Sequence, residues 1–143
     1  MLGCRGSRPV SGIHCQQFGG ATSCYIIKAD RHAIVLDCGT GLYDAGPFLE
    51  GCTHIDILLT HAPASGLNDG TDKAHKGFQV FNDLMDQYQP KWFIHGHMHL
   101  NYGANLPRVC TRGSTTVINA TERYEFEIPD PVQVPKRKLF GWG

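Results

Sequence analysis

The spacing of apolar residues along the chain separates the strands that we predict from the helices. Apolar runs on either side of the turn-forming pair Asp30-Arg31 predict a hairpin with strands at 22–29 and 32–37. An apolar run without polar alternation is typical of a strand buried on both faces, as in parallel sheets. Further short apolar runs predict strands at 55–60, 91–94, 115–119 and 124–128.

A helical period appears in the middle of the chain. Apolar residues recur there at three- and four-residue spacing and predict an amphipathic helix that ends before Pro90. A shorter helix is predicted at 42–49, although Gly46-Pro47 interrupts it. Strands with two interposed helices indicate an α/β fold. The apolar stripe of the longer helix consists of Phe78, Phe81, Leu84, Met85 and Tyr88.

Composition narrows the class of protein. With 143 residues, the chain is expected to form one domain over 1–143. Lysine and arginine number 13, as do aspartate and glutamate, so neither nucleic acid nor an anionic membrane is predicted as a partner. Because we find neither a membrane-spanning run nor a signal segment, we expect a soluble, cytoplasmic protein.

The cysteines are expected to be reduced thiols. Their spacing contains no Cys-x-x-Cys pair, and a cytoplasmic protein rarely keeps disulfides. Zinc–thiolate ligation is the alternative. The six cysteines are Cys4, Cys15, Cys24, Cys38, Cys52 and Cys110.

Histidines follow two of the predicted strands and carry the candidate chemistry. His61 follows the apolar run 55–60, and the box Gly96-His97-Met98-His99 follows the run 91–94. Side chains two apart on extended backbone point the same way, so His97 and His99 could reach one metal ion or two adjacent ions. Open α/β folds bind ligands at the carboxyl ends of their strands. The pattern therefore predicts a metal site there.

The first part of the chain resembles the start of a metallo-β-lactamase-fold hydrolase. The resemblance covers residues 1–61 in the order expected for that family. In the family the last segment opens an H-x-H-x-D-H metal motif, but here His61 is followed by Ala62-Pro63-Ala64-Ser65-Gly66. The other ligands of that motif are missing, so the lactamase-type site is not built. The matching segments are GCRGSRPV at 3–10, FGGATSC at 18–24, VLDCGTG at 35–41 and IDILLTH at 55–61.

The later part resembles the end of a calcineurin-like metallophosphoesterase, over residues 57–128. The resemblance implies that His61 and His97 bind one metal ion and that His99 binds the other. The remaining ligands of the family precede these elements, where this chain has its lactamase-like part. The matching segments are LLTHAP at 58–63, GLNDG at 66–70, Asp72, HKGF at 75–78, GHMH at 96–99, NYG at 101–103 and TVINA at 116–120.

Together the two resemblances predict a hybrid. Residues 1–56 form a lactamase-like half, 57–128 a phosphoesterase-like half and 129–143 an irregular tail. We interpret the chain as a deliberate or fortuitous recombinant. Both families are layered αββα sandwiches, so the resemblance implies two β-sheets with outer helices, in a reduced or chimeric version.

The metal ligands expected from this reasoning are His61, His97 and His99, with Asp37 as a weaker carboxylate candidate at the end of its strand. Three neutral imidazoles are enough to hold one zinc-type ion with an open position. The donor set suits zinc, manganese or iron, and leaves the identity of the divalent metal open. The alternative is that these histidines are bonded to backbone or water and hold no metal.

A polar loop between the helix and the strand before it offers further candidates. In phosphoesterases this loop borders the active site, so the resemblance suggests substrate binding by Asp69, Asp72 and His75. The alternative is that the aspartates make local turn hydrogen bonds and that His75 caps the following helix. His95 precedes the box and ranks fourth among the metal-ligand candidates.

Two functions follow from the sequence. The first is residual phosphodiesterase-type hydrolysis of a small phosphoester, by metal-bound hydroxide. The second is a catalytically inactive hybrid scaffold, with or without metal. Exposed sheet edges and apolar faces would favour a homodimer, which could complete a site between two copies.

Overall fold

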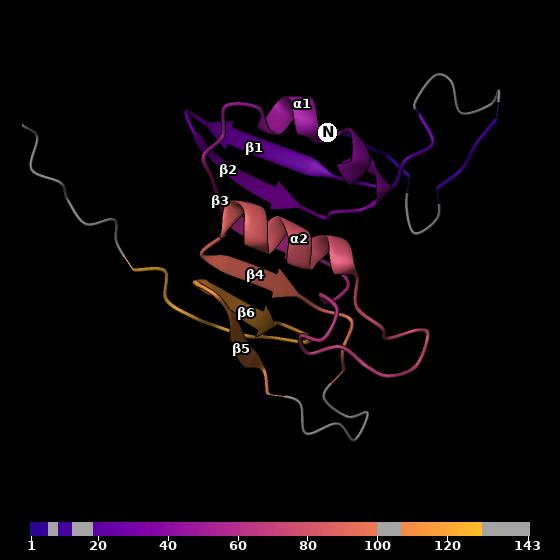
Figure 1. The fold of residues 1–143 in the computed structure, drawn as a ribbon. Coiled ribbons are helices and arrows are strands. Elements are labelled where there is room, and N and C mark those ends of the chain that lie inside the picture. The colour runs from indigo at the N-terminus through magenta and orange to yellow at the C-terminus, as the bar shows by residue number, and fades with distance from the viewer. Residues whose placement is uncertain (6–8, 13–18, 100–106, 130–143) are drawn as a thin grey trace, which may run out of the picture.

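The fold is built around one mixed β-sheet, seen from its helical side in Figure 1. A computed structural model describes residues 1–5, 9–12, 19–99 and 107–129. Among these residues the sheet has six strands, with β3 and β4 at its centre. In sheet order the strands are β1 (Tyr25–Ala29), β2 (His32–Leu36), β3 (His54–Thr60), β4 (Trp92–His95), β6 (Thr115–Asn119) and β5 (Val109–Arg112).

The strand pairing follows from the lengths of the connections. β1 and β2 form the predicted hairpin, with Ile27 opposite Ile34 and Asp30 at positive φ in the turn. The pairs β2–β3, β3–β4 and β4–β6 are parallel, because long crossovers join them. The carboxyl ends of four strands therefore meet at one edge of the sheet.

The longer helix, α2 (Gln79–Tyr88), confirms the helical period in the sequence. It buries Phe81, Asn82 and Met85 toward the sheet. It ends at Gln89, which adopts a left-handed conformation and donates its backbone N–H to the carbonyl of Met85. Pro90 follows directly and cannot continue the helix.

The helix predicted at 42–49 is divided into two pieces. A 3-10 helix, η2 (Thr40–Asp44), precedes a single α-helical turn, α1 (Gly46–Leu49). Pro47 lies in the first turn of α1, where a proline needs no hydrogen bond from its nitrogen. The Gly46-Pro47 pair therefore starts a new helical turn where the earlier one ends.

One predicted strand is wrong and one strand was missed. Residues 124–128 do not form a strand, and β5 lies earlier in the chain. Both neighbours of β6 are already in place, β4 on one side and β5 on the other, so no ladder position beside it remains. Residues 124–128 instead run beside the sheet, where the ring of Phe126 lies 5.9 Å from that of Trp92.

The α/β class is confirmed, but the layered two-sheet sandwich is not. The described part of the chain contributes one sheet and helices on one of its faces. The main core lies between that face and α2, where Val35, Leu58, Phe93 and Val117 are fully buried. No helix within the described ranges is long and apolar enough to cross a membrane.

Candidate functional site

The two central parallel strands bring His61 and His97 to the same edge of the sheet. β3 ends at Thr60, which is paired with His95 at the end of β4. His61 follows β3 directly, and His97 lies two residues beyond β4. The backbone N–H of Gly96 donates to the carbonyl of His61 at 3.1 Å, so the two strand ends are joined.

The imidazole rings of His61 and His97 are in direct contact. Nε2 of His61 and Nδ1 of His97 lie 3.0 Å apart, and the ring centroids are 4.8 Å apart. Nε2 of His97 donates to the carbonyl of Ala74 at 2.8 Å, which leaves Nδ1 of His97 as the acceptor facing His61. A lone pair of His97 therefore points at the ring of His61.

The backbone at His97 adopts an uncommon conformation. Its φ of 66° lies in the left-handed region, which non-glycine residues rarely occupy outside turns and functional sites. The chain leaves β4 at this point, so the strand alternation assumed for the histidine box stops before His97. The turn, rather than extended backbone, directs the ring of His97 toward His61.

Asn119 holds the histidine loop in place, and sequence reasoning did not assign it this role. This buried side chain at the end of β6 donates from Nδ2 to the carbonyl of Met98 at 2.8 Å. Its Oδ1 accepts the backbone N–H of Thr121 at 3.1 Å. In the sequence, the signal that could have indicated this role was an asparagine at the end of the predicted strand 115–119.

The loop before α2 places His75 and Asp72 beside the histidine pair. The ring centroid of His75 lies 5.1 Å from that of His97. Nδ1 of His75 donates to the carboxylate of Asp72 at 2.8 Å, and this hydrogen bond is the main reason that the pKa of Asp72 is lowered. Asp72 also accepts the backbone N–H of Ala74 at 2.9 Å. The loop that carries Ala74 is therefore folded by Asp72.

Asp69 binds the backbone of the loop rather than a histidine ring. Its Oδ2 accepts the backbone N–H of Gly77 at 3.0 Å, across the base of the loop. Of the three substrate-binding candidates, His75 and Asp72 lie beside the pair, whereas Asp69 closes the loop.

The structure brings two of the predicted metal ligands together, and it does not bring the others to them. His99 is exposed, and Asp37 is exposed at the end of β2 with a positive φ. In the described ranges, no group of three or more histidine, cysteine, aspartate or glutamate side chains is arranged to hold a metal ion. The arrangement is therefore a histidine pair with neighbours, not a closed metal cage.

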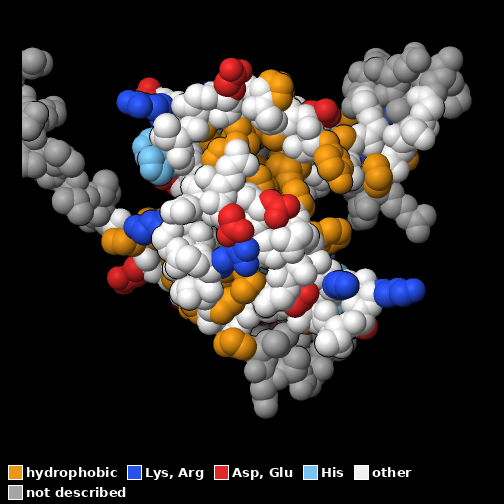
Figure 2. Space-filling view, viewed as in Figure 1, with side chains coloured by type: hydrophobic (Ala, Val, Ile, Leu, Met, Phe, Trp, Pro, Cys, Tyr) orange, Lys and Arg blue, Asp and Glu red, His pale blue; other side chains and the backbone are white. Residues whose placement is uncertain are grey.

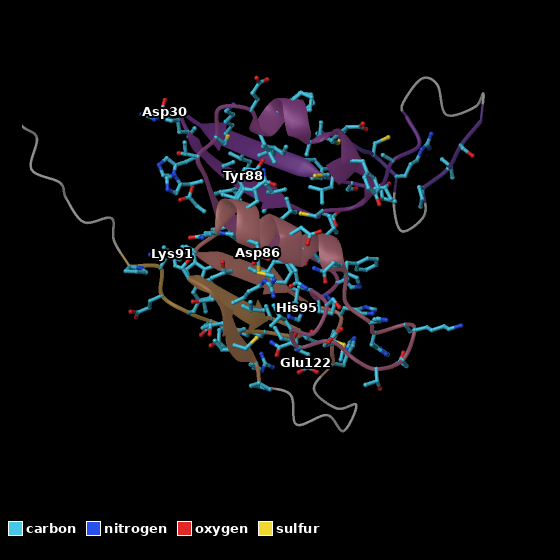
Figure 3. The ribbon with its side chains drawn as sticks, in the orientation of Figure 1. Asp30, Asp86, Tyr88, Lys91, His95 and Glu122 are labelled. Carbon is cyan, nitrogen blue, oxygen red and sulfur yellow. The ribbon has the colours of Figure 1, made fainter. Side chains whose placement is uncertain are left out.

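His95 is the buried histidine of this region, and Figure 3 labels it near the carboxyl end of β4. Its Nδ1 donates to the carbonyl of Gly96 at 3.0 Å. Burial lowers the pKa of His95, so the neutral ring is favoured. Its Nε2 has no hydrogen-bond partner among the described residues. His95 packs beside the ring of Phe93, which makes it part of the core.

A groove on the helical face reaches the histidine pair from one side. It lies between α1 and α2, has a volume of about 990 Å³ and is mainly apolar. Figure 2 shows hydrophobic side chains gathered in this hollow. Asp37, Cys38 and His61 line it together with Phe81 and Leu84. No pattern in the sequence indicated this groove.

Comparisons with known proteins relate the chain to metallophosphoesterases. Over 70 residues, 47% of this chain, it is 33% identical to metallophosphoesterase domain-containing protein 1 of Homo sapiens, and equally to that of Mus musculus. Over 94 residues, 64% of this chain, it is 30% identical to a UPF0046 protein of Caenorhabditis elegans. The chain is similar to metallophosphoesterase-domain proteins.

The similarity is partial. The matched segment spans only 20% to 22% of the length of these relatives. No family model matches the chain, and no solved structure matches it. These relatives support the calcineurin-like resemblance, whereas the lactamase-like half and the recombinant origin remain predictions.

Proposed function

We propose that the chain binds a divalent metal ion at the His61–His97 pair and has residual phosphoesterase activity toward small phosphoesters. The observation that carries this proposal is the 3.0 Å separation between Nε2 of His61 and Nδ1 of His97. The partial similarity to metallophosphoesterase-domain proteins supports it.

The donor atoms fit such an ion. Two imidazole nitrogens at about 2.0–2.1 Å from a tetrahedral zinc ion lie roughly 3.3 Å apart, which is close to the separation seen here. Metal-ligating histidines usually donate their other ring N–H to a carbonyl or carboxylate, as His97 does to Ala74. Binding would require His61 to carry its proton on Nδ1.

A third donor is needed to complete a stable site. His99 and Asp37 are the candidates from the sequence, and His75 is the candidate from the structure because it lies beside His97. The carboxylate of Asp72 orients the ring of His75 through Nδ1, which is the arrangement that tunes a histidine ligand. We propose His75 and His99 as the two residues to test first.

The ion would supply Lewis-acid activation of water and of a phosphoryl oxygen. His61 and His97 would hold it at the open end of β3 and β4, and Ala74 and Asn119 would fix the orientation of His97. The apolar groove beside His61 would exclude water from one side of a bound ester. Two-metal hydrolysis needs more carboxylates than the described site offers, so turnover should be slow.

The test is hydrolysis of bis-p-nitrophenyl phosphate by the full chain with added manganese or zinc, together with the metal content of the purified protein. We expect slow turnover and bound metal, both lost in a His97→Ala, His99→Ala double variant. Comparison with His75→Ala identifies the third donor. Metal-free, folded protein without turnover under all these conditions would contradict the proposal.

A second candidate function is a folded scaffold without catalysis. It is favoured by the observation that no group of three or more potential ligands is assembled among the residues that the structure describes. The same experiment separates the two candidates, because a scaffold gives no turnover above that of the double variant, whether or not it binds metal.

A further inference from the structure

The sheet has one face without helices. The crossovers from β2 to β3 and from β3 to β4 step across the sheet in the same direction. Because such crossovers are right-handed, they place their helices on the same side. Figure 1 shows α1 and α2 on one side of the sheet. We call the opposite side the open face.

The strand register identifies the side chains of the open face. Residues paired across a ladder share a face, so the pairs can be followed from strand to strand. Ile27 is opposite Ile34, and Leu59 is opposite Ile94. The open face thereby includes Ile27, Ile34, Leu59, Trp92, Ile94 and Val109.

These side chains are apolar and yet remain in contact with solvent. Ile27 is 55% exposed and Leu59 is 38% exposed, whereas Leu58, next to Leu59 but on the helical face, is fully buried. Phe126, from the segment after β6, covers part of Trp92. Parallel strands with apolar side chains on both faces are normally covered on both faces. Ile118, opposite Ile94 on the same face, is only 2% exposed, so this end of the face is already covered. The β1–β3 end has no covering layer among the described residues.

Charge on the open face lies at the amino ends of its parallel strands, where Nζ of Lys91 is 4.3 Å from the ring centroid of Trp92. Asp56 and His32 form an ion pair at the amino end of the parallel strands, with Nδ1 of His32 3.0 Å from the carboxylate. The ladder positions between them and the carboxyl ends carry isoleucine, leucine, tyrosine, tryptophan, threonine and valine. A neutral centre with charge at the edge is the composition of an interface core.

We propose that the open face is a homodimer interface, in which two copies of this chain stack their sheets about a two-fold axis. A flat apolar face without central charge can meet itself without repulsion, as an isologous interface requires. Two stacked sheets lie about 10 Å apart with strands within about 30° of each other. The helices of each copy would then lie on the outside.

The size of the face can be compared with the area that a specific interface needs. Six strands about 4.8 Å apart, each with about five residues rising about 3.3 Å, have a footprint on the order of 500 Å². Side chains that project from the sheet, together with Phe126 and Ile128, add to the area that could be buried. They bring it toward the roughly 800 Å² that each partner contributes to a standard interface. The face is therefore at the small end of specific interfaces, and we expect a reversible, concentration-dependent dimer.

The test is sedimentation velocity of the full chain from low-micromolar to near-millimolar concentration. The wild type should shift from monomer to dimer. Leu59→Lys places a charge at the centre of the open face and should raise the dissociation constant at least about tenfold. Val80→Lys is the matched control, because Val80 is 41% exposed but lies on α2, and its dimer should form as in the wild type.

Ile27→Lys provides a second variant in case Leu59→Lys does not fold, which circular dichroism would reveal. Ile27 lies on the edge strand β1, where a lysine is tolerated in a monomer. A wild type that stays monomeric at every concentration overturns the proposal. A dimer unaffected by either variant overturns it as well, since the interface then lies elsewhere.

Discussion

At the scale of single residues, the candidate site depends on how His61 and His97 are oriented. Their positions come from two strand ends, but the contact between the rings comes from a left-handed turn at His97 and from a hydrogen bond to Ala74. Asn119 holds the backbone at Met98, next to His97, and Asp72 holds the backbone at Ala74. Residues that bind no metal themselves therefore decide whether the histidine pair is preformed.

Asn119→Ala should weaken metal binding without removing a ligand. The variant loses the hydrogen bond to the carbonyl of Met98, which lies next to His97. We expect a stability loss of about 1–3 kcal/mol, because a buried carbonyl loses its partner. Metal affinity should fall by roughly 10–100-fold, as for other outer-shell residues. Urea unfolding and calorimetric zinc titration measure the two effects.

Asn82→Ala is the matched control for this variant. Asn82 is also buried and donates to a backbone carbonyl, that of Ser65, but it lies on α2. The control should lose a similar amount of stability and keep its metal affinity. Equal losses of affinity in both variants would mean that Asn119 acts only through general stability.

The sequence placed His61 and His97 at the same edge of the sheet, but it did not predict how their rings are arranged. His61 and His97 could be placed together because each follows an apolar strand. The contact of His75 with His97 could not be foreseen, because it depends on how Asp72 folds an irregular loop. Strand alternation also could not predict the direction of the His97 side chain, since the backbone leaves the extended conformation there.

At the scale of secondary-structure elements, the molecule is held by the packing of α2 on the central strands. Phe81 and Met85 of α2 are buried, and the ring of Phe81 lies 5.7 Å from that of Phe93 on β4. Phe93 is fully buried next to the strand end that carries the site. The helix therefore supports the same two strands that position the histidines.

Phe93→Ala should destabilise the fold by about 3–5 kcal/mol, because it removes a buried aromatic ring and leaves a cavity beneath α2. Phe48→Ala, on the exposed side of α1, should change stability by no more than about 0.5 kcal/mol. Urea unfolding curves of the two variants make the comparison. Similar losses in both would show that Phe93 is not a core residue.

The ion pair between α2 and β5 predicts a pH dependence. Arg112 donates two hydrogen bonds to the carboxylate of Asp86, at 2.8 Å and 2.7 Å, and these lower the pKa of Asp86. A carboxyl group with a lowered folded-state pKa stabilises the fold above its unfolded pKa and loses this effect as the pH falls through the folded value. The contribution is small, because the pair is exposed.

Asp86→Asn should therefore be slightly less stable than the wild type near neutral pH, and the difference should shrink as the pH falls below about 4. Unfolding by urea at a series of pH values measures it. In an Arg112→Gln background the same substitution is the control and should show no such trend, because the carboxylate then has no guanidinium partner. A difference that grows in acid would contradict the assignment.

Elements whose apolar residues follow a clear period could be predicted from the sequence. Elements for which two segments compete for the same place in the sheet could not. The hairpin β1–β2, the strands β3, β4 and β6 and the helix α2 follow from local pattern alone. The strand expected at 124–128 failed because β5 occupies the free side of β6. Two weakly patterned segments, 109–112 and 124–128, could each have paired with β6. The packing of the whole sheet decides between them, and local sequence patterns do not show it.

At the scale of the whole molecule, the sheet is covered unequally. One face is packed against helices, and the other carries exposed apolar residues. The apolar run at 32–37 predicted a strand buried on both faces, and the resemblance implied a second sheet. Neither could say whether a covering layer belongs to the same chain. The match to the relatives covers about a fifth of their length.

Metal binding by His61 and His97 is measured by titrating zinc into chelator-treated protein that comprises residues 1–143. The matched comparison is between a His61→Ala, His97→Ala variant and a His32→Ala, His54→Ala variant, whose rings stack at the amino ends of β2 and β3. We predict that the wild type and the second variant bind one equivalent of zinc with equal affinity, and that the first variant does not. Equal binding by all three proteins, or binding by none, would contradict the account.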